Sequence, residues 1–276
     1  MPFTDPGAVV VPDAHTGLTE AHVYAAIADV LDPELDEPLV KLGFIDRVRV
    51  DGPDITVVFK LPTYWCAPNF AYLMAADLRA SIRALPGVRT TRVVLLDHFA
   101  EDEINTGINC GQSFGEAFAG EVPEDENLEE LRRTFLRKGF LMRQERLMRQ
   151  MLKAGLDEAT ILTLRLSDLI ADELANIAFI VTTAGAVRLE GAGRNAGAYV
   201  RKRQTLGLPQ EQDALLITDD TGQPVAPGGL QDFLRRSRSV RMNIMFNTSM
   251  CKGLFRTRYE NAGANEAHRD DEGDIV

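Results

Sequence analysis

Residues 61–68, LPTYWCAP, decide the fold, because they join a predicted buried strand to a predicted amphipathic helix. Residues 54–61 are rich in β-branched and aromatic side chains and predict the strand, whereas residues 69–85 predict the helix. The first N–H groups of a helix lack intrahelical partners and stabilise an anion such as a thiolate. We therefore expect Cys66 to be a nucleophile or a soft-metal ligand. The alternative is a small buried apolar residue beside Trp65.

The chain has 276 residues, which allows one large domain or two modest ones, and we favour two. Its net charge of -11 argues against nucleic acid as the main partner and against binding to anionic membranes, since both depend on Lys and Arg. No run reaches the roughly 18 apolar residues that span a bilayer, and the first residues given do not show the basic segment, apolar core and cleavage site that are typical of a signal peptide. We expect a cytoplasmic protein.

The three cysteines, Cys66, Cys110 and Cys251, are widely spaced and form no C-x-x-C pair. Neither a disulfide framework nor a structural zinc site is indicated, so reduced thiols are expected. Three thiols are one fewer than the four that commonly hold an iron-sulfur cluster. A cluster would then need a non-cysteine ligand or a second subunit.

The N-terminal third predicts one small α/β domain. After a flexible tail over residues 1–17, Thr19 is a good N-cap for a helix over residues 21–31. Strands are predicted at 44–50, 54–61 and 88–96, the first two as a hairpin, with the helix at 69–85 before the third strand. The order is α-β-β-α-β with a three-stranded sheet.

An acidic turn, residues 32–38 (DPELDEP), follows the first helix and holds four carboxylates between prolines. Asp and Pro are turn formers and clustered acids usually form a solvated face, which is one explanation of this turn. A functional role for the carboxylates is the other.

These motifs together resemble the iron-sulfur cluster assembly domain of PaaD-like and SufT-like proteins over about residues 18–97. The matching features are the DPE turn at 32–34, Leu42-Gly43, Thr63-x-x-Cys66 before a helix, and LPGV at 85–88 before the last strand. The resemblance implies that Asp32, Glu34, Thr63 and Cys66 gather at one end of the sheet. It also implies that Cys66 contacts iron or an iron-sulfur cluster.

The chain departs from this family at one point, since many members have Gly-Cys-Pro where residues 65–68 read Trp-Cys-Ala-Pro. The indole of Trp65 either shields the thiol, with weaker ligation or a different client as the result, or is a packing residue.

Candidate ligands also follow the predicted third strand. Asp97 and His98 could add nitrogen or oxygen ligands beside a thiolate, although we favour a partly exposed strand-end histidine without a metal as the explanation of His98. Cys110 lies in a predicted loop with glycines nearby. The candidate metal ligands are therefore Cys66, Cys110, Cys251 and His98.

The rest of the chain predicts a mainly helical domain, which makes the fold class α+β. The predicted domains are residues 18–120 and 127–260, separated by an acidic linker at 121–126 and followed by a disordered tail at 261–276. Helices are predicted at 127–153, 158–164, 168–183 with Ser167 as N-cap, and 229–238.

Two surfaces of this second domain are candidates for partner binding. Residues 185–203 form a local basic run, either a solvated face or a docking surface for an acidic partner. Met and Phe residues at 242–250 precede Cys251 and predict either core or a partner-binding surface. Lys252 could favour the thiolate of Cys251.

Three functions are compatible with these features. The first is a metallocentre maturation factor that delivers iron or an iron-sulfur cluster to a client enzyme, and the family resemblance implies a bacterial oxygenase, for example a di-iron monooxygenase, as that client. The second is a metal-independent adaptor or chaperone for such a client, and the third is an enzyme with Cys66 as nucleophile. A homodimer would let two copies of Cys66 share one cluster. We expect no enzymatic activity.

Overall fold

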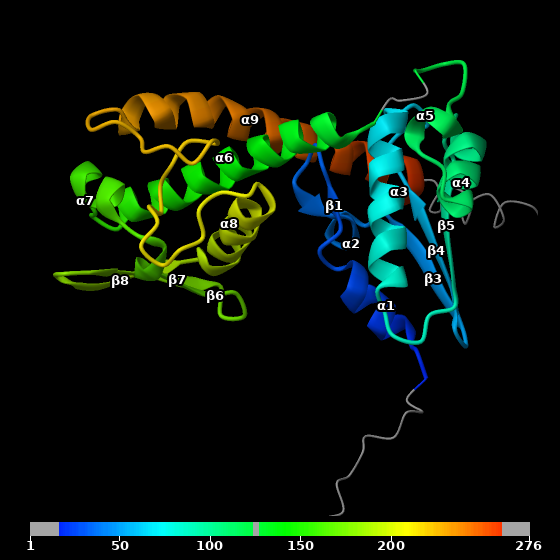
Figure 1. Ribbon diagram of the computed structural model, residues 1–276, viewed down its shortest axis with the longest axis horizontal. Helices are drawn as coiled ribbons and strands as arrows, with labels where there is room; N and C mark the ends of the chain where they lie inside the picture. Colours follow the sequence, from blue (N-terminus) through cyan, green and yellow to red (C-terminus); the bar gives the residue numbers. More distant parts are fainter. Residues whose placement is uncertain (1–16, 124–126, 261–276) are drawn as a thin grey trace, which may run out of the picture.

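The computed structural model describes residues 17–123 and 127–260, and Figure 1 shows their arrangement. The predicted C-terminal tail, the predicted N-terminal tail up to residue 16, and residues 124–126 of the predicted linker lie outside the described residues. The fold is α+β, as predicted, with a three-stranded sheet near the N-terminus and a mostly helical C-terminal region.

The N-terminal region contains the predicted α-β-β-α-β elements and several short additions. They are α1 (Glu20–Ile27), β1 (Leu31–Asp32), β2 (Glu37–Pro38), α2 (Leu39–Leu42), β3 (Ile45–Asp51), β4 (Asp54–Lys60), α3 (Pro68–Arg83), β5 (Thr90–Leu96), α4 (Glu101–Cys110) and α5 (Phe114–Ala117). Thr19 caps α1, as predicted, since its hydroxyl accepts from the backbone N–H of His22.

The main sheet has the strand order β3-β4-β5. β3 and β4 pair antiparallel as a hairpin, and β4 and β5 pair parallel with α3 as the crossover. α3 buries the apolar face that its sequence predicts, including Met74, Leu78 and Ile82. Because β4 and β5 are parallel, the segments that follow them leave the sheet at the same edge, and these segments carry Cys66 and His98.

The outer edge of β5 is covered by α4, where the sequence predicted a loop. Asn105 accepts from the N–H of Leu95 (2.8 Å) and donates to its C=O (2.9 Å), and Asn109 does the same at Val93 (3.0 and 2.8 Å). Two asparagines four residues apart on one helix face thus satisfy the backbone groups of an edge strand. Gly107 lies between them because a Cβ there would lie 2.5 Å from Cβ of Ala117.

The C-terminal region is built on two long helices. Its elements are α6 (Glu129–Lys153), α7 (Glu158–Thr163), η1 (Leu166–Asp168), β6 (Leu169–Asp172), β7 (Ile177–Thr182), β8 (Gly185–Glu190), α8 (Gly193–Thr205), α9 (Leu230–Phe255) and the π-helical turn η2 (Arg256–Glu260). Among the described residues, none of these helices combines the length and the apolar character that crossing a bilayer requires.

The predicted helix at 168–183 is wrong, because these residues form β6, a turn and β7. Ile177 to Thr182 alternate between buried and more exposed positions and pair with β8, and Asn176 adopts a left-handed conformation (φ 55°) that ends the turn. The β-branched run therefore dominated over the Ser167 cap signal. The predicted basic run at 185–203 divides between β8 and α8.

The buried apolar residues form two clusters, one around α3 and the main sheet and one among α6, α7, α8, β7, β8 and the start of α9. α9 belongs to both regions: Leu230, Phe233 and Leu234 lie in the second cluster, whereas Cys251 and Phe255 pack against the first. Figure 1 shows α6 and α9 running side by side towards the main sheet, in agreement with their contacts. The end of α9 is thereby brought to the edge of the sheet that carries Cys66.

Candidate functional site

The loop between β4 and α3 holds Cys66 close to Thr63. The Thr63 hydroxyl oxygen lies 3.2 Å from Sγ of Cys66, within hydrogen-bond distance for sulfur. Ala67 is the N-cap of α3 and Pro68 its first residue, so the loop enters the helix directly after the cysteine. The Thr63-x-x-Cys66 motif therefore acts as one unit in which the hydroxyl can donate to a thiolate.

His98 lies beside Cys66 but contacts its backbone. Nε2 of His98 lies 2.7 Å from the carbonyl oxygen of Cys66, and Nδ1 accepts from the N–H of Ala100 (3.1 Å). With Nδ1 as acceptor, Nε2 carries the proton and donates to Cys66. The ring is buried, and this burial lowers the pKa of His98. Both nitrogens are used, so His98 positions the cysteine loop and is not a free metal ligand.

Asp32 stabilises the acidic turn from within. Its Oδ1 accepts from the N–H groups of Glu34 and Leu35, both at 2.9 Å. Burial raises the pKa of Asp32 to about 6, although these two backbone hydrogen bonds act in the opposite direction. The turn-forming explanation of Asp32 is therefore the one that the geometry supports.

Asp36 joins the acidic turn to the C-terminal region. Its carboxylate pairs with Nε of Arg143 on α6 (2.7 Å) and with Lys202 on α8, and its backbone C=O accepts from Nη2 of Arg143 (2.7 Å). Asp36 is only 2% exposed. No local sequence signal distinguishes this carboxylate from its neighbours in the turn, because its partners lie 107 and 166 residues away.

The end of α9 reaches the same region. Asn247 donates to Oε1 of Glu34 (3.1 Å), and Phe255 packs on Phe44 with ring centroids 5.1 Å apart. Beyond α9, Arg258 donates to the C=O of Leu61 (3.3 Å) and of Asp97 (2.8 Å), which follow β4 and β5. The sequence carries no local signal for these contacts, so they were not predicted.

Cys251 lies one helical turn after Asn247 and packs against the same core cluster as Cys66. Burial raises the pKa of the Cys251 thiol to about 12, and Asp32, Cys66 and Glu34 add to this effect in that order. This direction is opposite to the effect that the sequence led us to expect from Lys252. The structure nevertheless places this thiol near Cys66 and the acidic turn, which the sequence did not reveal.

Cys110 lies elsewhere. It is the exposed last residue of α4, and not part of a loop as predicted. α4 starts three residues after His98, and its ten residues extend over about 15 Å. The predicted set of four ligands therefore separates into Cys66 and Cys251 near one another, His98 behind the cysteine loop, and Cys110 at the far end of α4.

Aromatic side chains surround the cysteine loop. Trp65 is 74% exposed. The interpretation of Trp65 as a packing residue is therefore wrong. Tyr64 and Phe99 are also exposed, with ring centroids 6.3 Å apart, and Phe99 stacks on His98 (4.9 Å). The exposed side chains of Tyr64, Trp65 and Phe99 form an apolar rim around the cysteine loop. Such a rim is typical of a surface that binds another macromolecule.

The donors at the site favour a soft metal cargo held in part by the protein. Two thiols suit iron or an iron-sulfur cluster, because soft thiolates select such species. Within residues 17–123 and 127–260, no three or more His, Cys, Asp and Glu side chains are grouped so as to hold a metal ion. A complete coordination shell would then require ligands from another molecule or movement of these side chains.

Comparison with known families places this site in context. Residues 20–95 match the family model described as iron-sulfur cluster assembly protein, whereas a comparison with curated proteins found no match. The matched span runs from α1 to β5 and contains Asp32, Glu34, Thr63 and Cys66, but not Cys251 or the rest of the C-terminal region. The resemblance predicted for the N-terminal third is thereby confirmed: residues 20–95 of this chain form a domain of the iron-sulfur cluster assembly family.

Proposed function

We propose that this protein holds iron or an iron-sulfur cluster as cargo at Cys66 and Cys251 and delivers it to a client metalloenzyme. The domain match supports a role in iron-sulfur cluster assembly or delivery. The observation that carries the finer proposal is that Cys251, on a helix outside the matched domain, packs against the same core cluster as Cys66, and that Cys66 and the acidic turn are close enough to raise the pKa of its thiol. The C-terminal region would thus supply the second thiol.

The two thiols have different roles in this proposal. Cys66 has the Thr63 hydroxyl within hydrogen-bond distance and is the first ligand. The Cys251 thiol, with its pKa raised to about 12, keeps its proton until a metal displaces it. Binding through Cys251 therefore releases a proton, and transfer proceeds by ligand exchange in which client thiolates or other ligands replace the two cysteines without any change in the number of electrons.

The client binds, in our proposal, to the exposed apolar face of α9 and to the aromatic rim around Cys66. The exposed side chains on α9 are Met242, Met245, Phe246, Met250 and Leu254. Methionine adapts to varied partners, and a patch of this extent on a monomer is typical of an interaction surface. The same helix carries Arg235, Arg236 and Arg238, which favour an acidic client. The resemblance to PaaD-like proteins leads us to propose an oxygenase, for example a di-iron monooxygenase.

A metal-independent adaptor is the second candidate. It is favoured by one observation, that the described residues contain no complete metal-binding group, while the apolar face of α9 needs no metal to bind a client. A cysteine-nucleophile enzyme has less support, because His98 uses both ring nitrogens and is not free to act as base. A homodimer that shares one cluster between two copies of Cys66 is compatible with the incomplete ligand set.

Anaerobic reconstitution with iron and sulfide tests the proposal. Wild-type protein is expected to gain a sulfur-to-iron charge-transfer band, and Cys66→Ala and Cys251→Ala are each expected to lose most of the band and of the bound iron. Cys110→Ala is the matched control, since this exposed thiol lies at the far end of α4, and its spectrum should equal that of wild type. Absence of a band in wild type favours the adaptor. Full loading of Cys251→Ala with iron would instead show that α9 supplies no ligand to the metal site.

A further inference from the structure

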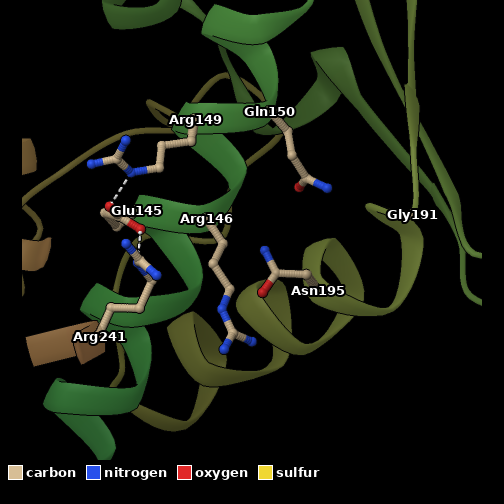
Figure 2. Close-up of a pocket in the computed structure, with 7 residues that line it drawn as sticks. All are labelled: Glu145, Arg146, Arg149, Gln150, Gly191, Asn195 and Arg241. Carbon is tan, nitrogen blue, oxygen red and sulfur yellow. Dashed lines mark hydrogen bonds and ion pairs between the residues drawn. The ribbon is translucent and has the colours of Figure 1, made fainter. Parts of the chain in front are cut away.

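A cavity lies in the C-terminal region, outside the matched domain. It has a volume of about 350 Å³ and lies between α6, the N-terminal part of α8 and α9. α6 contributes Glu145, Arg146, Arg149 and Gln150, whereas α8 contributes Asn195 and α9 contributes Arg241. Its volume is that of a site for a small molecule. In Figure 2, Arg146, Gln150 and Asn195 lie between α6 and α8, whereas Glu145 points toward Arg149 and Arg241 on the other side of α6.

The cavity is positively charged in a protein whose net charge is -11. Three arginines and one glutamate line it. Glu145 is fully buried, and its two oxygens are held by Nε of Arg149 and by Nε of Arg241 (2.8 Å). Glu145 is therefore already neutralised, and within residues 17–123 and 127–260 Arg146 has no ion-pair partner in the cavity.

Arg146 needs an anionic partner. Within residues 17–123 and 127–260, no hydrogen bond or ion pair reaches its guanidinium, which is partly buried. Burial is the main cause that lowers the pKa of Arg146, followed by the charge of Arg143 and, less strongly, that of Arg241, whereas the charges of Glu37 and Asp36 raise it. A guanidinium does not lose its proton in a protein, so the charge persists and is costly without a partner.

Two acceptors beside Arg146 need donors. Oδ1 of Asn195 and Oε1 of Gln150 are buried, and neither receives a hydrogen bond in the part of the chain that the structure describes. Nδ2 of Asn195 donates to the C=O of Arg143 (2.9 Å), which fixes the orientation of that amide. One cation and two acceptors that converge on a single cavity match a molecule that carries both an oxyanion and hydroxyl groups.

We propose that this cavity binds a small hydroxylated oxyanion, either a phosphate ester or a hydroxycarboxylate. The oxyanion pairs with Arg146, and hydroxyl groups donate to Asn195 Oδ1 and Gln150 Oε1. This inference is independent of the proposed metal cargo, since none of its residues belongs to the cysteine site.

Isothermal titration of the full-length, metal-free protein tests the inference with four probes: glycerol 3-phosphate, citrate, inorganic phosphate and glycerol. Glycerol 3-phosphate or citrate is expected to bind saturably, inorganic phosphate more weakly because it lacks the carbon-bound hydroxyls, and glycerol not at all. Binding of glycerol 3-phosphate alone assigns a phosphate ester, and binding of citrate alone assigns a hydroxycarboxylate. The affinity should fall as salt rises.

Substitutions locate the binding. Arg146→Gln is expected to weaken it at least about tenfold, because a charge-assisted hydrogen bond in a buried site is lost, and Arg146→Lys should retain part of it. Arg188→Gln, on an exposed arginine of β8 outside the cavity, should bind like wild type. Arg146→Gln should also melt no lower than wild type without ligand, since it removes an unpaired buried charge. Failure of both glycerol 3-phosphate and citrate to bind, or unchanged binding in Arg146→Gln, would overturn the inference and leave a cavity filled with water.

Discussion

At the scale of single residues, Asp36 connects the two regions most directly. It is an anion, 2% exposed, between two cations, and its main chain has a positive φ of 54° that Asp and Asn tolerate better than other non-glycine residues. Removing one partner of a buried ion pair leaves the other charge without compensation, which is much more costly than losing a surface pair.

Asp36→Asn should therefore lower the free energy of unfolding by roughly 3–5 kcal/mol, because Arg143 and Lys202 remain as buried cations. Asparagine keeps the size and tolerates the backbone conformation, so the change isolates the charge. Urea denaturation measures the effect. Asp51→Asn, at an exposed pair with Arg49, is the control and should change stability by less than about 1 kcal/mol. Equal effects of the two substitutions would contradict the buried pairing.

The three cysteines should differ in reactivity in the metal-free protein. Cys110 is exposed, whereas the Cys251 thiol is partly buried and its pKa is raised to about 12. Because alkylation requires the thiolate, the fraction of Cys251 that reacts at pH 7.5 should be very small, and it should grow as pH rises towards 12. Peptide mass spectrometry after a timed iodoacetamide pulse should find Cys110 labelled first and Cys251 last. Labelling of all three at one rate is expected only after denaturation.

At the scale of elements, the two long helices differ in how closely they are packed. Gly139 on α6 faces the Asp36 pair: a Cβ there would lie 2.8 Å from Oδ1 of Asp36 and 3.0 Å from Cε of Lys202. A Cβ added at Gly253 on α9 would meet no neighbour within 4 Å. Glycine is thus required at the first position by close approach, and at the second it only weakens the helix.

Gly139→Ala and Gly253→Ala should consequently have opposite effects on stability. The first should destabilise by roughly 1–3 kcal/mol, since the added methyl group crowds a buried ion pair. The second should stabilise by about 0.5–1 kcal/mol through helix propensity. Thermal and urea denaturation of the two variants provide the test. If Gly139→Ala raised the free energy of unfolding, this result would contradict the close approach of α6 to the acidic turn.

At the scale of the whole molecule, α6 and α9 attach the C-terminal region to the assembly domain. α6 pairs Arg132 with Asp77 on α3 through two hydrogen bonds of 2.7 and 2.8 Å. α9 is anchored at its start in the second apolar cluster, and its end is held to the first through Phe255 and Phe44. The two ends of α9 are therefore held by different apolar clusters, and each can loosen separately.

Phe255→Ala should loosen the second half of α9 alone. We expect a loss of about 1–2 kcal/mol in stability, since this side chain is half-buried, and faster hydrogen exchange over residues 242–260 with unchanged protection at 230–234. Phe246→Ala, at a ring that is 67% exposed, is the control on the same helix and should leave exchange unchanged. Faster exchange along all of α9 would show that its two ends are not held independently.

Local sequence signals were sufficient for much of the N-terminal domain. The β-branched run of β4, the apolar face of α3 and the Thr19 cap act over a few residues, so composition and spacing identified them. The same kind of reasoning failed at residues 168–183, where a cap signal competed with a β-branched run and pairing with β8 decided the outcome. It also failed at Cys110, where pairing of Asn105 and Asn109 with β5 supports a helix.

The candidate site shows the same division. The sequence by itself determined that Thr63 and Cys66 share one loop before a helix, because three residues of separation fix their proximity whatever surrounds them. Only the tertiary structure decided that Cys251 comes near Cys66, that Cys110 lies elsewhere, and that Asp36 rather than Asp32 pairs with cations of the C-terminal region. These pairings join residues more than 100 positions apart. They depend on how α6 and α9 cross from one apolar core to the other, and no local pattern encodes that geometry.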